Sequence, residues 1–227
     1  MAEANWQDTE LTSEEKIASL ILARHGESPP VNVRRIAAEY ARIEEDAFTV
    51  SCDAVTIRDP DGSERPLLLL NKNSTSLETR KRFTISHETG HLKIPWHCGS
   101  IACHIDEGEA SVSGDHYSLE GEAHRFASEL LMPTEVVKRV IAEESSIEKI
   151  YEHVMNIAYV SRTAARIKLM KTLPPGFVCV DYDPATGQIV RIDESGRGFL
   201  SLFIEPGDRT SFQRLSKALE FPCGRWA

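Results

Sequence analysis

Short segments with helical patterning occupy the first part of the chain. Thr12–Glu15 has the composition of a capping box and predicts a helix that runs through Leu22. Pro29 and Pro30 then interrupt the chain, and a second helix is expected over Val33–Tyr40. The chain is therefore expected to begin with two short helices.

A strand-like pattern follows these two helices. The stretch Ala47–Ile57 is rich in Val, Thr, Phe and Ile, and Pro66–Asn71 is again apolar. Between them, Asp59–Gly62 has the residues of a tight turn. These three segments predict a β-hairpin, so a small sheet is expected before the next helix.

Two helices are expected in the centre of the chain. Thr75–Glu78 is a second capping box, and the helix that it opens must end by Pro95. After a polar loop, a further helix is expected over Leu119–Leu131, which Met132 and Pro133 end. Its inward-facing stripe is predicted to consist of Glu122, Ala123, Phe126, Ala127, Leu130 and Leu131.

The pattern changes from helical to alternating towards the end of the chain. Three more helices are expected, over Glu135–Glu143, Ile147–Asn156 and Val160–Leu169. Alternating strands follow from Phe177, with turns at Pro184–Gly187 and Glu194–Gly198 and then a helical piece over Ser211–Leu219.

These elements predict an α+β fold in which helices dominate. We expect an N-terminal helix and linker over residues 1–30. A mostly helical domain with a small sheet and a helix-turn-helix-like segment is expected over 31–173, and a small β-rich domain over 174–227.

Composition and charge narrow the class of protein. The 227 residues include 41% hydrophobic residues and carry a formal net charge of -9, which indicates a globular protein without an extended nucleic-acid-binding surface. The longest aliphatic run, Leu67–Leu70, is too short to cross a bilayer, and the acidic start differs from a secretory signal. We expect a cytoplasmic protein with no membrane partner, whose five scattered cysteines are reduced thiols.

The sequence His87-Glu88-Thr-Gly-His91 supplies the chemistry. On a helix, the spacing of four residues places both imidazoles on one face, where they can bind one zinc ion. Glu88 projects from the adjacent edge and can take a proton from the attacking water and pass it to the leaving amine. The motif therefore predicts a catalytic Zn²⁺ site for amide hydrolysis.

A catalytic zinc needs a third protein ligand, for which Glu122 is the first candidate. It shares a predicted helix face with Phe126 and Leu130, where an unpartnered carboxylate is costly. Glu120 and Glu129 are alternative ligands, and a salt-bridged Glu122 at the edge of the core is the non-functional interpretation.

The two histidine-containing helices also resemble a known family. The HExxH sequence, followed by Glu122-Ala-His-Arg-Phe-Ala-Ser-Glu-Leu-Leu-Met-Pro133, is similar to the ImmA/IrrE zinc metallopeptidases, and the similarity extends over roughly Val31–Leu173. The resemblance implies the ligand set His87, His91 and Glu122. It also implies cleavage of a protein partner, commonly a helix-turn-helix repressor, which derepresses stress, mobile-element or phage-defence genes. In some relatives a GAF-like domain follows, which the strands after Phe177 would represent in short form.

Two further side chains are candidates for roles in catalysis. His97 lies just beyond the metal-binding helix and is the first choice among the other histidines to hydrogen-bond an oxyanion. Cys103 lies in the loop before Glu122 and is a candidate fourth zinc ligand that would hold the enzyme latent. A buried, idle thiol is the alternative interpretation of Cys103.

Two other functions are compatible with the sequence. The chain could be a DNA-binding regulator with a vestigial metal site, in which Val154–Lys171 is a recognition unit beside basic residues. It could instead bind a protein partner without cutting it. The acidic composition and the intact Glu88 count against the regulator, because a structural metal site does not need that glutamate.

Overall fold

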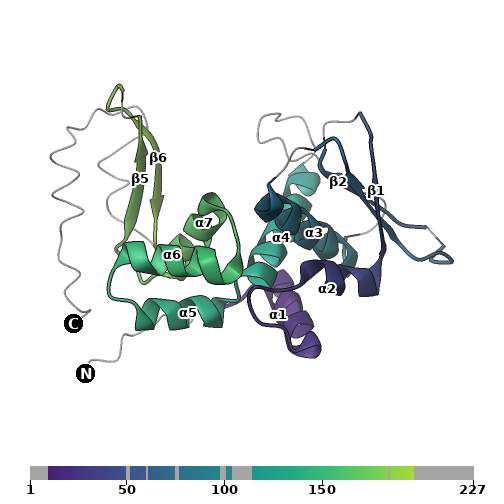
Figure 1. Ribbon diagram of the computed structural model, residues 1–227, viewed down its shortest axis with the longest axis horizontal. Coiled ribbons are helices and arrows are strands. Elements are labelled where there is room, and N and C mark those ends of the chain that lie inside the picture. Colours follow the sequence, from purple (N-terminus) through teal and green to yellow (C-terminus); the bar gives the residue numbers. More distant parts are fainter. Residues whose placement is uncertain are drawn as a thin grey trace. The chain divides into compact units, whose positions relative to one another are not determined.

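The structure is a computed structural model that describes residues 10–49, 52–59, 61–74, 77–97, 101–103, 114–183 and 185–196, without the side chains of 101–103, 114–118 and 181–182. The helices in this part of the chain are α1 Ser13–His25, α2 Val33–Tyr40, α3 Glu78–Lys93, α4 Gly114–Leu131, α5 Thr134–Glu143, α6 Ile147–Ala158 and α7 Arg162–Thr172 (Figure 1). The strands are β1 Arg42–Asp46, β2 Ala54–Ile57, β3 Leu67–Asn71, β4 Ile101–Cys103, β5 Val178–Tyr182 and β6 Ile189–Glu194. The predicted α+β fold, with helices dominant, is confirmed.

The chain forms two compact units, and their limits differ from the domains expected from the sequence. One unit contains Leu11–Pro133 and Val154–Arg162, and the other contains Glu10 and residues 134–153 and 163–196 of the described chain. The first unit holds both motif histidines and the four-stranded sheet. None of the described helices is long and apolar enough to span a membrane.

The sheet of the first unit has the strand order β1-β3-β2-β4. The predicted hairpin is confirmed, because β2 and β3 pair antiparallel, although β2 begins only at Ala54. Strand β1 pairs parallel with β3 and was not predicted from the sequence. Its sequence Arg-Ile-Glu-Glu-Asp is charged and mostly exposed, as an edge strand can be, so no apolar alternation indicated it.

Helix α1 belongs to the same unit as the motif helix and packs against α4. Its predicted capping box is confirmed, because the backbone N–H of Thr12 donates to Glu15 Oε2 at 2.9 Å. Two buried carboxylates join the helices: Glu14 pairs with Arg125, and Glu129 accepts a hydrogen bond from Ser19 at 3.2 Å. Helix α1 therefore fixes α4 from the side.

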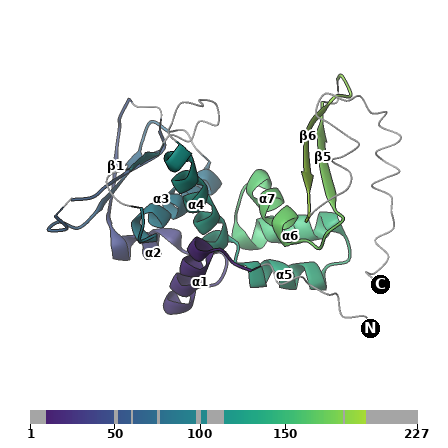
Figure 2. The ribbon, with the colours of Figure 1, turned by 180° about the vertical axis from the view of Figure 1, so that it is seen from behind.

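Helix α3 is the buried centre of this unit. It packs against α4, α2 and β2, and Figures 1 and 2 both show it beside α4. Its N-cap is Leu77 and it ends at Lys93, before Pro95 as expected; Thr75 of the predicted capping box lies outside the described residues. Every residue from Thr84 to His91 is buried, which allows polar side chains in this stretch to meet away from water.

Gly90 allows α3 and α4 to approach closely. A Cβ atom at this position would lie 3.0 Å from Phe126 Cδ1 and 3.4 Å from Ala123 Cα. Phe126 and Ala123 are fully buried, so neither can move aside without shifting α4. The glycine of the motif therefore sets the distance between the two helices that carry the site.

Replacing Gly90 with Ala is expected to lower the free energy of unfolding. Overpacking costs about 1–3 kcal/mol, whereas the gain in helix propensity is about 1 kcal/mol, so we expect a net loss of roughly 1 kcal/mol. The matched control is Gly121→Ala on α4, where the nearest atom is Nη1 of the flexible Arg125 at 3.3 Å. Urea denaturation should show the control at or above wild-type stability; equal stabilisation by both substitutions would contradict tight packing at Gly90.

The second unit contains α5, most of α7 and the hairpin of β5 and β6. Ser195 is buried after β6, and its hydroxyl donates to the carbonyl of Pro174 at 2.6 Å. The predicted strands after Phe177 are thus present as one hairpin. The predicted helical piece over Ser211–Leu219 lies outside the described residues, and a GAF-like domain stays a prediction.

Candidate metal centre

Three side chains from α3 and α4 converge on one point. His87 and His91 lie one turn apart on α3, and their Nε2 atoms are 3.1 Å apart. Glu120 on α4 completes the group, with Oε2 3.0 Å from His87 Nε2 and Oε1 3.3 Å from His91 Nε2. Both imidazoles are fully buried, so the motif histidines meet a carboxylate away from bulk water.

The structure brings Glu120 to the histidines and places Glu122 elsewhere. Helical periodicity of about 100° per residue puts Glu120 within about 20° of Ala127 and Leu131, at one edge of the buried stripe. Glu122 lies on the flank of that stripe. The apolar residues predicted for this stripe are all buried, as expected. The helical register of Glu120 with Ala127 and Leu131 could already be read from the sequence.

Burial and mutual contact set the protonation of this cluster. Burial lowers the pKa of His87 to about 4, so its imidazole is neutral at pH 7 and can offer a lone pair. Burial alone raises the pKa of Glu120, but hydrogen bonds to His87 and His91 outweigh this and lower the pKa well below its ordinary value. His87 is therefore neutral and Glu120 ionised, the protonation states in which these groups bind a divalent metal.

The separations in this cluster fit a zinc site. Zinc–ligand bonds of about 2.0–2.1 Å at tetrahedral angles place neighbouring donor atoms about 3.3 Å apart. The two Nε2 atoms here are 3.1 Å apart, and the Glu120 carboxylate places one oxygen 3.0 Å from His87 Nε2 and the other 3.3 Å from His91 Nε2. Two imidazoles and one carboxylate can therefore hold one metal ion and leave a fourth position to water or substrate.

Glu88, which lies between the two histidines in the sequence, is held by strand β2. Its side chain is fully buried, and Oε2 accepts a hydrogen bond from the buried Thr56 hydroxyl. Two residues further on, Arg58 donates to the backbone carbonyls of His91 and of His97, the latter at 2.9 Å. Thr56 and Arg58 were not predicted from the sequence, because nothing in a short strand indicates which helix it will border.

His97 and Glu122 form a second group next to His91. Nδ1 of His97 lies 2.9 Å from Nδ1 of His91, and Nε2 of His97 lies 2.9 Å from Glu122 Oε2. Trp96 also donates its indole N–H to Glu122. Both ring nitrogens of His97 thus face side chains of this group, and its expected role as an oxyanion donor stays a prediction.

The ionisation of this second group follows from its surroundings. Burial lowers the pKa of His97, although the hydrogen bond to Glu122 acts in the opposite direction. Burial raises the pKa of Glu122, but Trp96 and His97 outweigh this and lower it. Cys103 lies on β4 with its Cα opposite Ala54, and its side chain lies outside the described residues, so its role as a zinc ligand stays a prediction.

Comparisons with known proteins agree with this geometry. The model of the Peptidase_M78 family, described as an IrrE N-terminal-like domain, matches residues 30–170. No curated protein matches the chain. A solved Mycobacterium tuberculosis transcriptional regulator is similar, with 13% identity and a TM-score of 0.55 over 86% of this chain and 59% of that one.

The similarity to the regulator concerns the fold alone, and this chain spans about three-fifths of the regulator's length. The family match is more specific, since the matched region includes both motif histidines, Glu88 and Glu120. More than half of the chain is matched, so the chain belongs to the Peptidase_M78 family.

Proposed function

We propose that this protein is a zinc-dependent endopeptidase that cleaves a partner protein. The observation that carries the proposal is the buried convergence of His87, His91 and Glu120, with Glu88 beside them on the same helix. A site that only stabilises the fold has no need for an additional carboxylate at this position. Membership of a peptidase family supports the same function.

The residues of the site divide the work of amide hydrolysis. His87, His91 and Glu120 would hold the zinc ion, which when bound polarises the scissile carbonyl and acidifies water. Glu88 would take the proton of the attacking water on its carboxylate and deliver it to the leaving amine. Thr56 keeps the Glu88 side chain in one orientation by donating to Oε2. The burial of the cluster would strengthen these interactions by excluding water.

The proposed substrate is a helix-turn-helix repressor whose removal turns genes on. The resemblance of the two motif helices to repressor-cleaving peptidases supports this substrate class. A second candidate function is a regulator that binds DNA without cutting protein, which is favoured by the fold that this chain shares with a transcriptional regulator. Two of the basic residues that such a regulator would use are already engaged: Lys168 is buried on Thr134, and Arg166 pairs with Asp193 at 3.2 Å.

Removal of metal is expected to abolish cleavage. Purified protein incubated with a helix-turn-helix protein encoded beside it should yield a discrete fragment. A chelator should stop the reaction, and added zinc should restore it, because the polarising cation is essential to the chemistry. Mass spectrometry of the product would locate the scissile bond. Binding of the partner without a metal-dependent fragment would favour the non-cleaving function instead.

A further inference from the structure

We propose that Glu122 and His97 are positioning residues that act through His91. The three side chains form one hydrogen-bonded chain that runs from Glu122 through His97 to the buried His91. This inference rests on the proposed metal centre and adds to it the device that sets the direction and tautomer of one ligand. In this proposal Glu122 is not a metal ligand and His97 is not an oxyanion donor. Both contact the metal site only through His91.

The number of protons on each group determines which atom donates in each hydrogen bond from His91 to Glu122. An ionised Glu122 can only accept, so Nε2 of His97 must carry the hydrogen that faces it. The other nitrogen of a neutral His97 is then an acceptor, so Nδ1 of His91 must be the donor in the 2.9 Å contact between them. A neutral His91 that carries its hydrogen on Nδ1 has a lone pair on Nε2. That is the atom 3.1 Å from His87 Nε2 and 3.3 Å from Glu120.

Neighbouring residues hold the hydrogen-bonded side chains of Glu122, His97 and His91 in place. His91 and His97 are fully buried, and Arg58 binds the backbone carbonyl of each of them. Trp96 donates a second hydrogen bond to Glu122, which fixes the carboxylate that ends the chain. Ligand histidines in zinc sites usually donate their second N–H to such a partner, which sets the tautomer and raises the basicity of the ligand.

His87 provides an internal contrast. Its Nδ1 has no hydrogen-bond partner among the described residues, and its ring packs against Phe83 and His124, with centroids 6.3 and 4.7 Å away. Ring packing therefore orients His87, whereas hydrogen bonds orient His91. The polar support of the metal centre is concentrated on one of the two histidines.

Substitutions that break the hydrogen bonds between Glu122, His97 and His91 are expected to weaken zinc binding, while the three ligands stay in place. His97→Phe and Glu122→Ala should each raise the zinc Kd by about 10- to 100-fold, the usual range for partners of metal ligands. The Kd is measured by competition with a chromophoric chelator. The matched controls are His153→Phe, at a partly exposed site, and Glu135→Ala, at an exposed one. Both residues belong to the other compact unit, so the Kd should be unchanged.

A double-mutant cycle tests whether Glu122 acts through His97. If it does, the doubly substituted protein should lose about as much zinc affinity as the worse single variant, because either change breaks the same chain. Losses that multiply, or no loss in either single variant, would overturn the inference. Glu122→Ala, which leaves every ring in place, keeps the inference testable if His97→Phe does not fold, as judged by circular dichroism.

Cobalt substitution separates this inference from the proposed function. The tetrahedral absorption band of the cobalt-loaded protein should persist in the His97 and Glu122 variants, because all three ligands remain. If the wild-type protein binds neither zinc nor cobalt, the proposed metal centre itself is wrong. If the wild type binds both metals tightly and the His97 and Glu122 variants match it, only the positioning chain is wrong.

Discussion

Replacing Glu88 with Gln is expected to lower the rate of partner cleavage by about 10²- to 10⁴-fold, the range for loss of a general acid–base. The amide has nearly the same shape as the carboxylate, and its oxygen can still accept the hydrogen bond from Thr56. It cannot accept a proton from water. Since Glu88 is not among the three converging ligands, the variant should retain zinc at wild-type stoichiometry. Cleavage is followed as initial rates of fragment formation, and zinc by elemental analysis.

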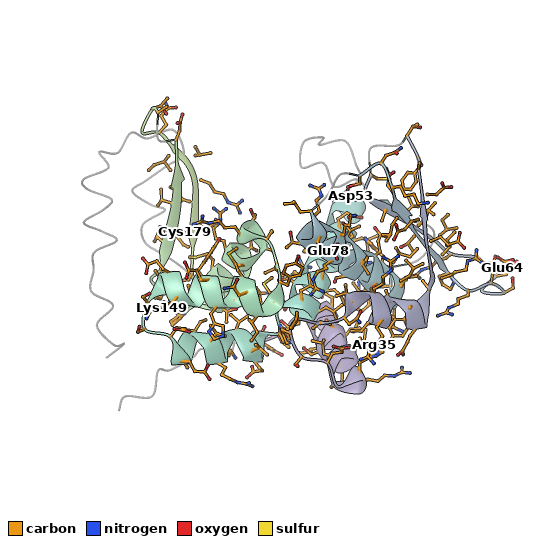
Figure 3. All side chains as sticks on the ribbon, in the orientation of Figure 1. Arg35, Asp53, Glu64, Glu78, Lys149 and Cys179 are labelled. Carbon is orange, nitrogen blue, oxygen red and sulfur yellow. The ribbon has the colours of Figure 1, made fainter. Side chains whose placement is uncertain are left out.

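A matched control lies on the same helix. Glu78→Gln changes an exposed residue at the start of α3, labelled in Figure 3, and should leave cleavage at the wild-type rate. Undiminished cleavage by Glu88→Gln would show that another group transfers the proton. Loss of zinc from the same variant would show that Glu88 has a structural role at the centre.

Local patterns predicted the helices well because their signals are short-range. Val33–Tyr40 has the bounds expected from the sequence, and the capping box at Thr12 forms the predicted hydrogen bonds. The helix α4 begins earlier than expected, at Gly114, because the polar residues at its start continue no apolar stripe in the sequence. The strand β1 has no short-range signal, because its sequence is charged and its partner β3 is separated from it by β2.

The motif residues were predictable for a different reason. The spacing of His87 and His91 places their side chains one turn apart wherever the helix packs, so one element suffices to bring them together. Glu120 and Thr56 come from other elements, and their positions depend on how α4 and β2 pack on α3. Single-sequence patterns do not contain that packing. For Glu120 alone, its helical register with Ala127 and Leu131 was a usable signal.

The hydrogen bonds of Glu122 also show why a glutamate next to the apolar stripe of a predicted helix does not by itself identify a metal ligand. Both glutamates border the apolar stripe of α4, and both need compensation for leaving water. Glu120 obtains it from two imidazoles of the motif, and Glu122 obtains it from Trp96 and His97. The sequence pattern of one helix predicts that such a glutamate has a hydrogen-bond partner. Which residue that partner is depends on how the helix packs in the fold.

Paired substitutions on α4 should separate the two glutamates by their effect on zinc. Glu120→Ala removes one of the three converging ligands. Zinc sites bind with about 10–16 kcal/mol, so one ligand in three is worth several kcal/mol, or about a thousand-fold in Kd. Glu122→Ala removes only the end of the positioning chain and should cost about 10- to 100-fold.

The comparison is matched because the same substitution is made two residues apart on one helix, and chelator competition reports both Kd values. Elemental analysis after a fixed chelator challenge should find Glu120→Ala stripped at a concentration that leaves Glu122→Ala largely loaded. Cobalt-loaded Glu120→Ala should also lose the intensity of its tetrahedral band, since water replaces the carboxylate. The reverse order of the two affinities would establish Glu122 as the third ligand. It would also require α4 to turn so that Glu122, and not Glu120, meets His87 and His91, because residues two apart lie about 160° away from each other around a helix.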